Sequence, residues 1–299
     1  MEASVKFTLS FDGSLSKHHQ IDLYDVSQAL IGFQRSLALT THLVINDEII
    51  TQAPSLKGAS IFALPPKEGS WEIIGLVIAG VATAGYKLGT TPKNTPLGHL
   101  IYSLYDYVVK ESLGFHVDYD KTIGQLYEDK KKAGLAIPKI EQHQADALIE
   151  KCSTAITEIH RPIYKTGSAQ NANILGDYGD GPKAVGGTFD FQSYDYIHEE
   201  FEAERSEVIT GRVSSYNSNT FKGRIYVAKE GRPIAFELAK HCRTNNLVQL
   251  IVASLSVNAI KDYRNQWSEV NCQVFKITSR SGQLKSYKIT DISNSKITE

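Results

Sequence analysis

Residues 208–238 read VITGRVSSYNSNTFKGRIYVAKEGRPIAFEL and decide the expected fold of the last third of the chain. They contain three runs in which apolar and polar side chains alternate, at Val208–Tyr216, Phe221–Ala228 and Pro233–Leu238. This period of two is typical of strands with one buried face. Asn-Ser-Asn separates the first two runs and Glu-Gly-Arg the second two, and both sequences are typical of hairpin turns.

Three more runs follow, at Val248–Asn258, Cys272–Ser281 and Leu284–Ile292, with Ser-Gly-Gln between the last two. The run Val248–Asn258 could also form a helix. We favour a strand because residues 251, 253, 255 and 257 are apolar and most of the residues between them are polar. Six short strands after Arg205 predict a small β-barrel or sandwich.

The part of the chain before Arg205 mixes strands and helices. Val5–Phe11 alternates and predicts an opening strand. Asp22 can cap a helix, because apolar residues from Leu23 to Leu37 then recur every three or four positions. The other expected elements are strands at Ser60–Leu64 and Ser70–Val77 and helices at Leu97–Ser112, Tyr119–Ala133 and Ile140–Ile159.

Two segments lie between these regions. Gly176–Thr188, GDYGDGPKAVGGT, is rich in glycine and is either a linker or a long hairpin turn. The acidic run His198–Glu204 is expected to be a short, solvated helix. The fold class is therefore α+β, with a mixed strand/helix domain at 1–180, an acidic, glycine-rich connection at 181–204 and a small β-barrel-like domain at 205–299.

Charge is sorted along the chain. Residues 1–204 carry 17 Lys+Arg against 26 Asp+Glu, a balance of −9, and residues 205–299 carry 15 against 7, a balance of +8. The sum is the −1 of the whole chain. This asymmetry predicts two modules with different surfaces, and a polyanion is one possible partner of the basic module.

The segment Ile73–Tyr86, IIGLVIAGVATAGY, has about 13 uninterrupted apolar or small residues, which is fewer than the roughly 20 that span a bilayer. We expect a buried strand and helix here rather than a membrane span. Small residues also allow close approach between copies of a protein. The alternative is therefore an oligomer interface at four glycines: Gly75, Gly80, Gly85 and Gly89.

The second predicted strand of the barrel has a basic and aromatic face. Lys222, Arg224 and Tyr226 alternate with residues of the opposite, apolar face. Arg212 and Arg232 could extend this face from the neighbouring segments. Cations that hold phosphate and a ring that stacks on a base are the means by which small barrels bind single-stranded nucleic acid. An ordinary solvated barrel face is the alternative interpretation.

Candidates for acid–base or metal chemistry cluster near the glycine-rich stretch: Asp177, Asp180, Asp190, His198 and Glu200. Their spacing fits no metal-binding motif, and turn formation explains the aspartates. His18-His19 is a weak metal candidate in a polar loop. His160-Arg161-Pro162 with Lys165 is a basic helix end that could bind an anion. We therefore predict no catalytic residues, no metal and no cofactor, and the chain is more consistent with a binding protein than with an enzyme.

Other motifs are incomplete or absent. Gly75–Gly80 matches the first half of a phosphate-binding loop, but Val81-Ala82 stands where Lys-Ser/Thr is required. Cys152, Cys242 and Cys272 form no CxxC or Cys/His cluster, which argues against a disulfide framework or a zinc site and favours a reducing compartment. The opening sequence MEASVKFTLSFDG lacks the features of a signal peptide. A cytoplasmic protein is expected.

Several stretches of the chain resemble an uncharacterised family of bacterial and phage proteins found on mobile elements. They are FDGSLSKHHQIDLYDVSQALIGFQR (11–35), PPKEGSWEI (65–73), HRPIYKTGS (160–168), GRVSSYNSNTFKGRIYVAKEGRPIAFEL (211–238) and SGQLKSYKITDI (281–292). The resemblance implies a bacterial cytoplasm, or a host cytoplasm for a phage protein, and a role in phage–host conflict. It assigns no role to any residue.

Together these features predict a non-catalytic protein that assembles with itself and binds a protein partner, as a defence component or an inhibitor of defence. The first alternative is a barrel that binds single-stranded nucleic acid. The second is a divergent metal-dependent nuclease or hydrolase.

Overall fold

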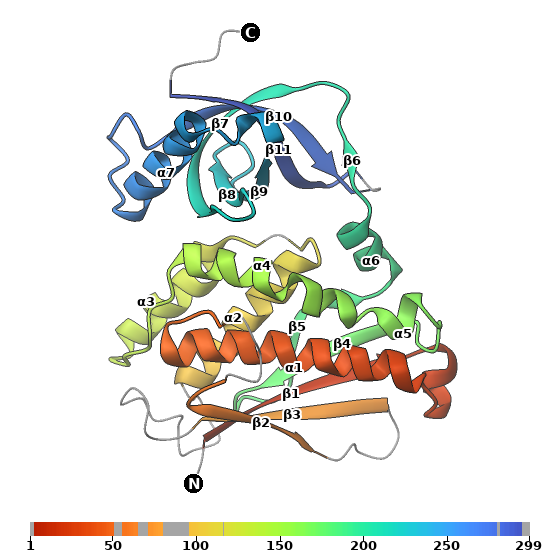
Figure 1. Cartoon of the computed structure of the whole chain (residues 1–299). Helices are drawn as coiled ribbons and strands as arrows, with labels where there is room; N and C mark the ends of the chain where they lie inside the picture. The colour runs from red at the N-terminus through yellow and green to blue at the C-terminus, as the bar shows by residue number, and fades with distance from the viewer. Residues whose placement is uncertain are drawn as a thin grey trace. The chain divides into compact units, whose positions relative to one another are not determined.

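The computed structural model describes residues 3–50, 56–64, 71–79, 96–115, 117–279 and 282–294. The chain divides into two compact units, Met1–Ile197 and His198–Glu299. Figure 1 labels their helices and strands. The predicted α+β class is confirmed, with mixed strands and helices in the first unit and a closed five-stranded barrel in the second.

The first unit is built on an antiparallel sheet of strand order β2-β3-β1-β4-β5. The central strand presents Val5, Phe7, Leu9 and Phe11 on one face, and all four are buried. Alternation along the strand explains this, because every second residue points to the same side. The strands are β1 (Ala3–Asp12), β2 (Ala59–Leu64), β3 (Trp71–Ala79), β4 (Asn171–Asp177) and β5 (Lys183–Phe189).

Three helices lie on the same side of this sheet in Figure 1: the first two contact its strands, and the third packs on the other two helices. They are α1 (Leu23–Asn46), α2 (Pro96–Ser112) and α4 (Gln142–Glu158). As predicted, the Asp22 side chain caps α1 by accepting a hydrogen bond from the Asp25 N–H at 2.9 Å. The shorter elements are the 3₁₀ turn η1 (Ser14–His18), the π-helical turn η3 (Asp120–Gly124), α3 (Gln125–Lys132), α5 (Arg161–Tyr164) and α6 (Phe191–His198).

The glycine-rich stretch is a hairpin between β4 and β5 rather than a linker. Gly186 has a φ of +71°, and a Cβ atom there would collide with the Val109 side chain on α2. The Gly186 N–H also donates to Oδ1 of Asp106 at 2.7 Å. Glycine is therefore required for α2 to lie against β5. Because β5 and α6 follow, the first unit extends to Ile197, through much of the segment expected as a connection.

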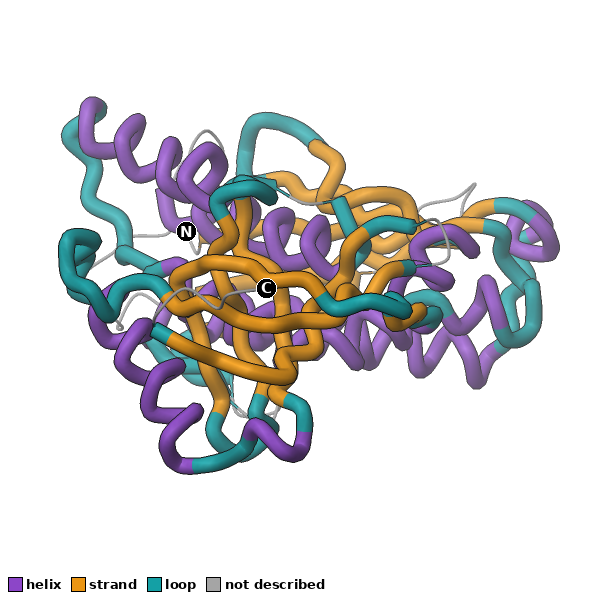
Figure 2. Tube along the Cα trace, turned by 90° about the horizontal axis from the view of Figure 1, so that it is seen from above, coloured by secondary structure: helices purple, strands orange, loops and turns teal. Residues whose placement is uncertain are grey.

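The second unit is a closed barrel in which β7, β8, β9, β11 and β10 are paired in that order and β10 returns to β7. The β9–β11 pair is parallel and the others are antiparallel. Figure 2 shows these strands in orange, curving around one another beneath the C-terminal marker. The strands are β7 (Glu207–Asn217), β8 (Lys222–Val227), β9 (Arg232–Leu238), β10 (Val270–Thr278) and β11 (Leu284–Ser293).

The predicted strand Val248–Asn258 is wrong, because this segment belongs to helix α7 (Asn245–Ala259). Its buried positions, Ile251 and Ser254, have helical spacing. The Ser254 hydroxyl accepts a hydrogen bond from the Val213 N–H at 3.0 Å, and the Asn258 amide donates to the Val213 carbonyl at 3.1 Å. Val213 lies at an irregularity in the β7–β8 pairing. The polar residues that suggested strand alternation thus fix α7 to β7.

Candidate functional site

The sequence predicts a basic and aromatic face on the barrel, formed by Arg212, Lys222, Arg224, Tyr226 and Arg232. The structure places the first on β7, the next three on β8 and the last on β9. Ile225 and Val227 on β8 are buried in the barrel core. The alternating residues of β8 therefore point outward, as the pattern indicates.

Arg212 and Tyr226 are brought together as direct partners across β7 and β8. The guanidinium carbon of Arg212 lies 5.1 Å from the ring centroid of Tyr226 and 4.7 Å from that of Tyr263. Tyr263 comes from the loop between α7 and β10 and is 50% exposed. Cation–π contacts of this kind hold an arginine in place without cancelling its charge, and each is worth about 0.5–1 kcal/mol at an exposed site. We call these three residues the Arg212 cluster.

Lys222 is paired with an acidic residue that the sequence analysis did not consider. Glu237 on β9 lies opposite Lys222, and its carboxylate is 3.7 Å from the Lys222 ammonium. The other oxygen of Glu237 accepts from Arg243 at 2.9 Å. The side chains of Glu237 and Lys222 are about half exposed, so this pairing contributes little to stability. It does reduce the positive potential at this end of β8.

Arg224 and Arg232 are tied to the barrel backbone. Arg224 donates to the Pro233 carbonyl at 3.2 Å, and Arg232 donates to the Leu284 carbonyl at 3.1 Å. Each guanidinium thereby links neighbouring strands. These two residues brace the barrel, and the Arg212 cluster is the part of the predicted face where a cation and aromatic rings meet.

The acidic run 198–204 lies against the barrel instead of forming a solvated helix. Phe201–Glu202 form the short strand β6, which pairs with β10. Glu202 pairs with Lys288 at 2.8 Å and Glu200 with Lys285 at 3.3 Å. Burial lowers the pKa of Lys285, and the Glu200 charge opposes that shift. With the four glutamates of this run, residues 198–299 carry 15 basic against 11 acidic side chains, a balance of +4.

The loop after α7 carries further exposed aromatic and basic side chains. Its sequence from Lys261 to Trp267 is KDYRNQW, and Trp267 is 37% exposed. Trp267 also lines an open groove of about 430 Å³ along α7. The other lining residues are Asn246, Gln249, Leu250, Ala253, Ser256 and Val257. Because Tyr263 touches Arg212, this loop joins the α7 side of the barrel to the outer face of β7 and β8.

The carboxylates considered for acid–base or metal chemistry have local partners. Asp177 accepts hydrogen bonds from the N–H groups of Gly179 and Gly181, and Asp190 accepts from the Ser193 N–H at the start of α6. Asp180 lies 3.5 Å from the Lys183 ammonium. Among the described residues, no three His, Cys, Asp or Glu side chains are grouped so that they could hold a metal ion.

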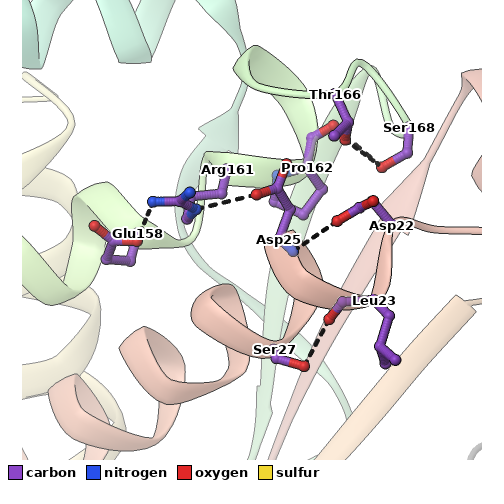
Figure 3. A network of polar contacts seen from close by, with 9 residues as sticks. All are labelled: Asp22, Leu23, Asp25, Ser27, Glu158, Arg161, Pro162, Thr166 and Ser168. Carbon is purple, nitrogen blue, oxygen red and sulfur yellow. Dashed lines mark hydrogen bonds and ion pairs between the residues drawn. The ribbon is translucent and has the colours of Figure 1, made fainter.

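The basic helix end at 160–165 is occupied by an internal ion network, which Figure 3 shows. Arg161 donates to Asp25 at 3.2 Å and to Glu158 at 3.3 Å. The Asp25 side chain is nearly buried, with 4% exposed, and the Tyr24 ring lies 5.3 Å from the Arg161 guanidinium. Two carboxylates around one guanidinium disfavour a bound anion at this helix end. The network instead joins α1, through Asp25, to the end of α4, through Glu158.

Gly75, from the predicted oligomer interface, lies on the helix-covered face of the first sheet. A Cβ atom on Gly75 would lie 3.3 Å from the Phe33 ring of α1. The small size of Gly75 therefore allows α1 of the same chain, and not a second copy, to approach the sheet closely. Gly80, Gly85 and Gly89 lie outside the described residues.

The three cysteines are buried thiols. Burial raises the pKa of Cys152 and of Cys272 to about 12 and raises that of Cys242. A thiol that is protonated and enclosed is a poor nucleophile. The structure thus gives none of these thiols the environment of a reactive cysteine.

Sequence reasoning did not find Tyr263, Trp267 or Glu237. Both aromatic residues follow a segment that the sequence analysis interprets as a strand. The loop that brings Tyr263 to Arg212 on β7 was therefore not expected. The alternation of aromatic and basic residues in KDYRNQW was a usable signal. Glu237 was missed because only basic and aromatic residues of the neighbouring segments were considered, whereas the β8–β9 pairing places Glu237 opposite Lys222.

Comparison with known protein families covers both units. A family described as "Domain of unknown function (DUF7946)" matches residues 7–198, which is more than half of the chain. The chain belongs to this family. A second model, "Family of unknown function (DUF7947)", matches residues 205–293. The two matches meet close to the boundary at Ile197. No curated protein and no solved structure matches this DUF7946 protein. No described helix has the length and apolar character that a membrane span requires.

Proposed function

We propose that this DUF7946 protein is a non-catalytic binding protein whose barrel takes up single-stranded nucleic acid. The observation that carries the proposal is the Arg212 cluster, in which one arginine contacts two tyrosines on the outer surface of a closed barrel. The tyrosines come from segments 37 residues apart, at 226 and 263. The fold therefore brings two tyrosine rings from separate segments to one arginine.

The connectivity of the barrel supports the proposal. Five strands close in the spatial order β7-β8-β9-β11-β10, and the β9–β11 pair is parallel. Along the chain, α7 lies between β9 and β10. Five-stranded Greek-key barrels of the OB type use the face of their second and third strands, and nearby loops, to bind oligonucleotides or oligosaccharides. Here those strands are β8 and β9. The connectivity supports the proposal at the level of the fold, and the Arg212 cluster supports it at the level of the site.

The chemistry of the cluster selects a polyanion with aromatic bases. An arginine provides charge for a phosphate, and the rings of Tyr263, which is 50% exposed, and of the half-buried Tyr226 provide surfaces on which an unpaired base can stack. Lys261 and Arg264 lie on either side of Tyr263 in the same loop and, with Asp262 between them, give it a balance of +1. Double-stranded nucleic acid keeps its bases stacked on one another, so the rings favour a single strand.

The test is a fluorescence anisotropy titration of the full chain with labelled oligothymidylate and oligouridylate. We expect binding at about 50 mM salt that weakens steeply by about 200 mM, because bound cations displace condensed counterions. Arg212→Ala should reduce the slope of log K against log salt by about one unit for one lost phosphate contact. Tyr226→Ala or Tyr263→Ala should weaken binding by about 1–3 kcal/mol with little change in slope.

Tyr24→Ala is a matched control for these variants. Tyr24 is also exposed and also contacts an arginine, Arg161, but it lies in the first unit. Binding by this variant should equal that of the wild type. If the wild-type chain does not bind either oligonucleotide at about 50 mM salt, where the electrostatic contribution is strong, the proposal is wrong. Equal losses in the Tyr24 and Tyr263 variants would also contradict it.

A further inference from the structure

A groove lies along α7, beside the loop that carries Tyr263. The residues of α7 that line it recur every three or four positions and therefore form one stripe on the helix. They are Asn246, Gln249, Leu250, Ala253, Ser256 and Val257. This stripe is separate from Ile251 and Ser254, the positions of α7 that are buried. We call the space between the stripe and Trp267 the α7 groove.

The lining of the α7 groove favours a flat, uncharged ligand. The seven described residues that line it are all uncharged. Leu250 and Val257 give apolar surface, Trp267 gives an aromatic ring, and Asn246 and Gln249 provide amide donors and acceptors. Small-molecule sites typically combine apolar and aromatic surface with a few polar groups. The volume of about 430 Å³ lies within their usual range of roughly 300–1,000 Å³.

The backbone on both sides of Trp267 is held in place. The Trp267 N–H donates to Oδ1 of Asn265 at 3.0 Å, and the Ser268 N–H donates to the Asn265 carbonyl at 2.9 Å. The Ser254 hydroxyl of α7 donates to the Ser268 carbonyl at 2.8 Å. These bonds tie the loop to the helix, so Trp267 is positioned before a ligand arrives and less entropy is lost on binding.

The α7 groove and the Arg212 cluster share the loop that follows α7. Tyr263 and Trp267 are four residues apart in this loop, so their Cα atoms are separated by at most about 14 Å. Barrels of this type bind about 4–16 nucleotides of a single strand, and even a stacked strand advances about 3.4 Å per nucleotide. One strand is therefore long enough to contact both rings.

We propose that the α7 groove holds one purine base of the strand that the Arg212 cluster binds. This inference rests on the proposed function and adds a base-selective subsite to it. The base stacks on Trp267, and the amides of Asn246 and Gln249 bond to its polar edge. A purine has two fused rings, as indole does, and overlaps more of Trp267 than a pyrimidine does. The stripe from 246 to 257 covers about 16 Å of helix, which leaves room for a two-ring base and its sugar.

The fluorescence of Trp267 reports directly on the α7 groove. The chain has 2 tryptophans, and Trp71→Phe removes the other one, which packs on Phe11 in the first sheet. Oligoadenylate added to this variant at about 50 mM salt, where phosphate contacts are strong, should quench the fluorescence. The midpoint should equal that of the anisotropy of the same strand carrying a label. Oligothymidylate should bind and quench less.

Substitutions in the α7 groove test the preference for purines. Trp267→Ala should weaken oligoadenylate binding by roughly 5- to 150-fold and oligothymidylate binding by less. The salt dependence should not change, because no charge is removed. Gln249→Ala should reduce the ratio of the two affinities. Val252→Ala is the matched control, because Val252 is a 47% exposed residue of α7 outside the stripe, and it should bind both strands like the wild type.

The outcomes separate this inference from the proposed function. Anisotropy that shows binding without quenching of Trp267 would overturn the inference and leave the proposed function intact. The same holds if a folded Trp267→Ala variant binds oligoadenylate like the wild type. If no strand binds, the proposed function is wrong, and adenosine monophosphate then tests the groove alone. Stronger quenching by adenosine monophosphate than by uridine monophosphate would support a purine site, and equal or no quenching would overturn it.

Discussion

The two sheets of this protein have similar inner faces and different outer faces. Phe7 on β1 and Ile225 on β8 are both fully buried, as expected for inward positions of alternating strands. On the outside, β3 presents Ile74 and Leu76, whereas β8 presents Lys222, Arg224 and Tyr226. The outer face of the first sheet is aliphatic at these positions of β3, and that of the barrel is basic and aromatic along β8.

This difference suggests that the two surfaces have different partners. An aliphatic sheet face is stabilised by removal from water, which favours contact with another protein surface. A face of arginine and tyrosine can stay in water, because its charges are solvated and its rings lie against cations. We therefore propose nucleic-acid binding for the second unit alone.

The largest expected effect tests the contrast between the two faces of β1. Phe7→Ala removes a fully buried ring that packs edge-on to Tyr105 at 5.3 Å. It should lower the free energy of unfolding by about 3–5 kcal/mol. Thr8→Ala, on the outer face of the same strand, should change it by less than about 0.5 kcal/mol. Urea denaturation at low protein concentration measures both values. Similar losses for the two variants would mean that the outer face is covered within the monomer.

An intermediate effect is expected where α7 joins the barrel. Ser254→Ala leaves the buried Val213 N–H and the Ser268 carbonyl without their hydroxyl partner. A buried group without a hydrogen bond costs about 1–3 kcal/mol, and the free energy of unfolding should fall by that amount. Ser256→Ala, on the exposed side of the same helix, is the control and should have little effect. Equal stabilities of the two variants would show that the Ser254 hydroxyl does not hold α7 in place.

A third effect, absent at neutral pH, is a pH dependence of the first unit. Burial, with the nearby charges of Lys130 and Lys183, lowers the pKa of His99 to about 4, and the ring stacks on Tyr178 at 4.5 Å. The unfolded chain binds a proton at His99 below about pH 6.5, whereas the folded chain does so only near pH 4. Stability should therefore be unaffected above pH 6.5 and should fall as the pH decreases from 6.5 to 4.

His99→Phe keeps an aromatic ring on Tyr178 and removes the titrating group. Denaturation at several pH values can be followed by labelling Cys152 in the first unit, with Cys272 as the control in the second. The variant should lose part of the acid sensitivity at Cys152. An unchanged pH profile would mean that His99 does not contribute to it.

Most strands and helices could be predicted from the sequence, because their side-chain periods are regular. The strands at the N-terminus, the Asp22 cap and five of the six barrel strands agree with the structure. Helix α7 could not be predicted from periodicity alone. Its Ser254 and Asn258 point inward to bond the Val213 backbone, and polar residues at buried positions obscure the helical pattern.

The candidate site was predictable only in part. The pairing of Arg212 with Tyr226 follows from two adjacent strands, and both residues were identified as candidates. The contribution of Tyr263 depends on the position of a loop that follows α7, which the sequence pattern does not specify. Likewise, Gly75 marks a close approach, but only the packing of α1 on the sheet shows that its partner is Phe33 of the same chain.

Photocrosslinking tests the central claim most directly, because it reports which unit contacts the polynucleotide. The full chain is bound at low salt to an oligonucleotide that contains 4-thiothymidine, irradiated and digested, and the linked peptides are identified by mass spectrometry. Our account predicts crosslinks in peptides that contain Tyr226 and Tyr263, and a strong reduction of both when Arg212 is changed to Ala. Crosslinks confined to peptides of the first unit, or a pattern that the Arg212→Ala change does not alter, would contradict it.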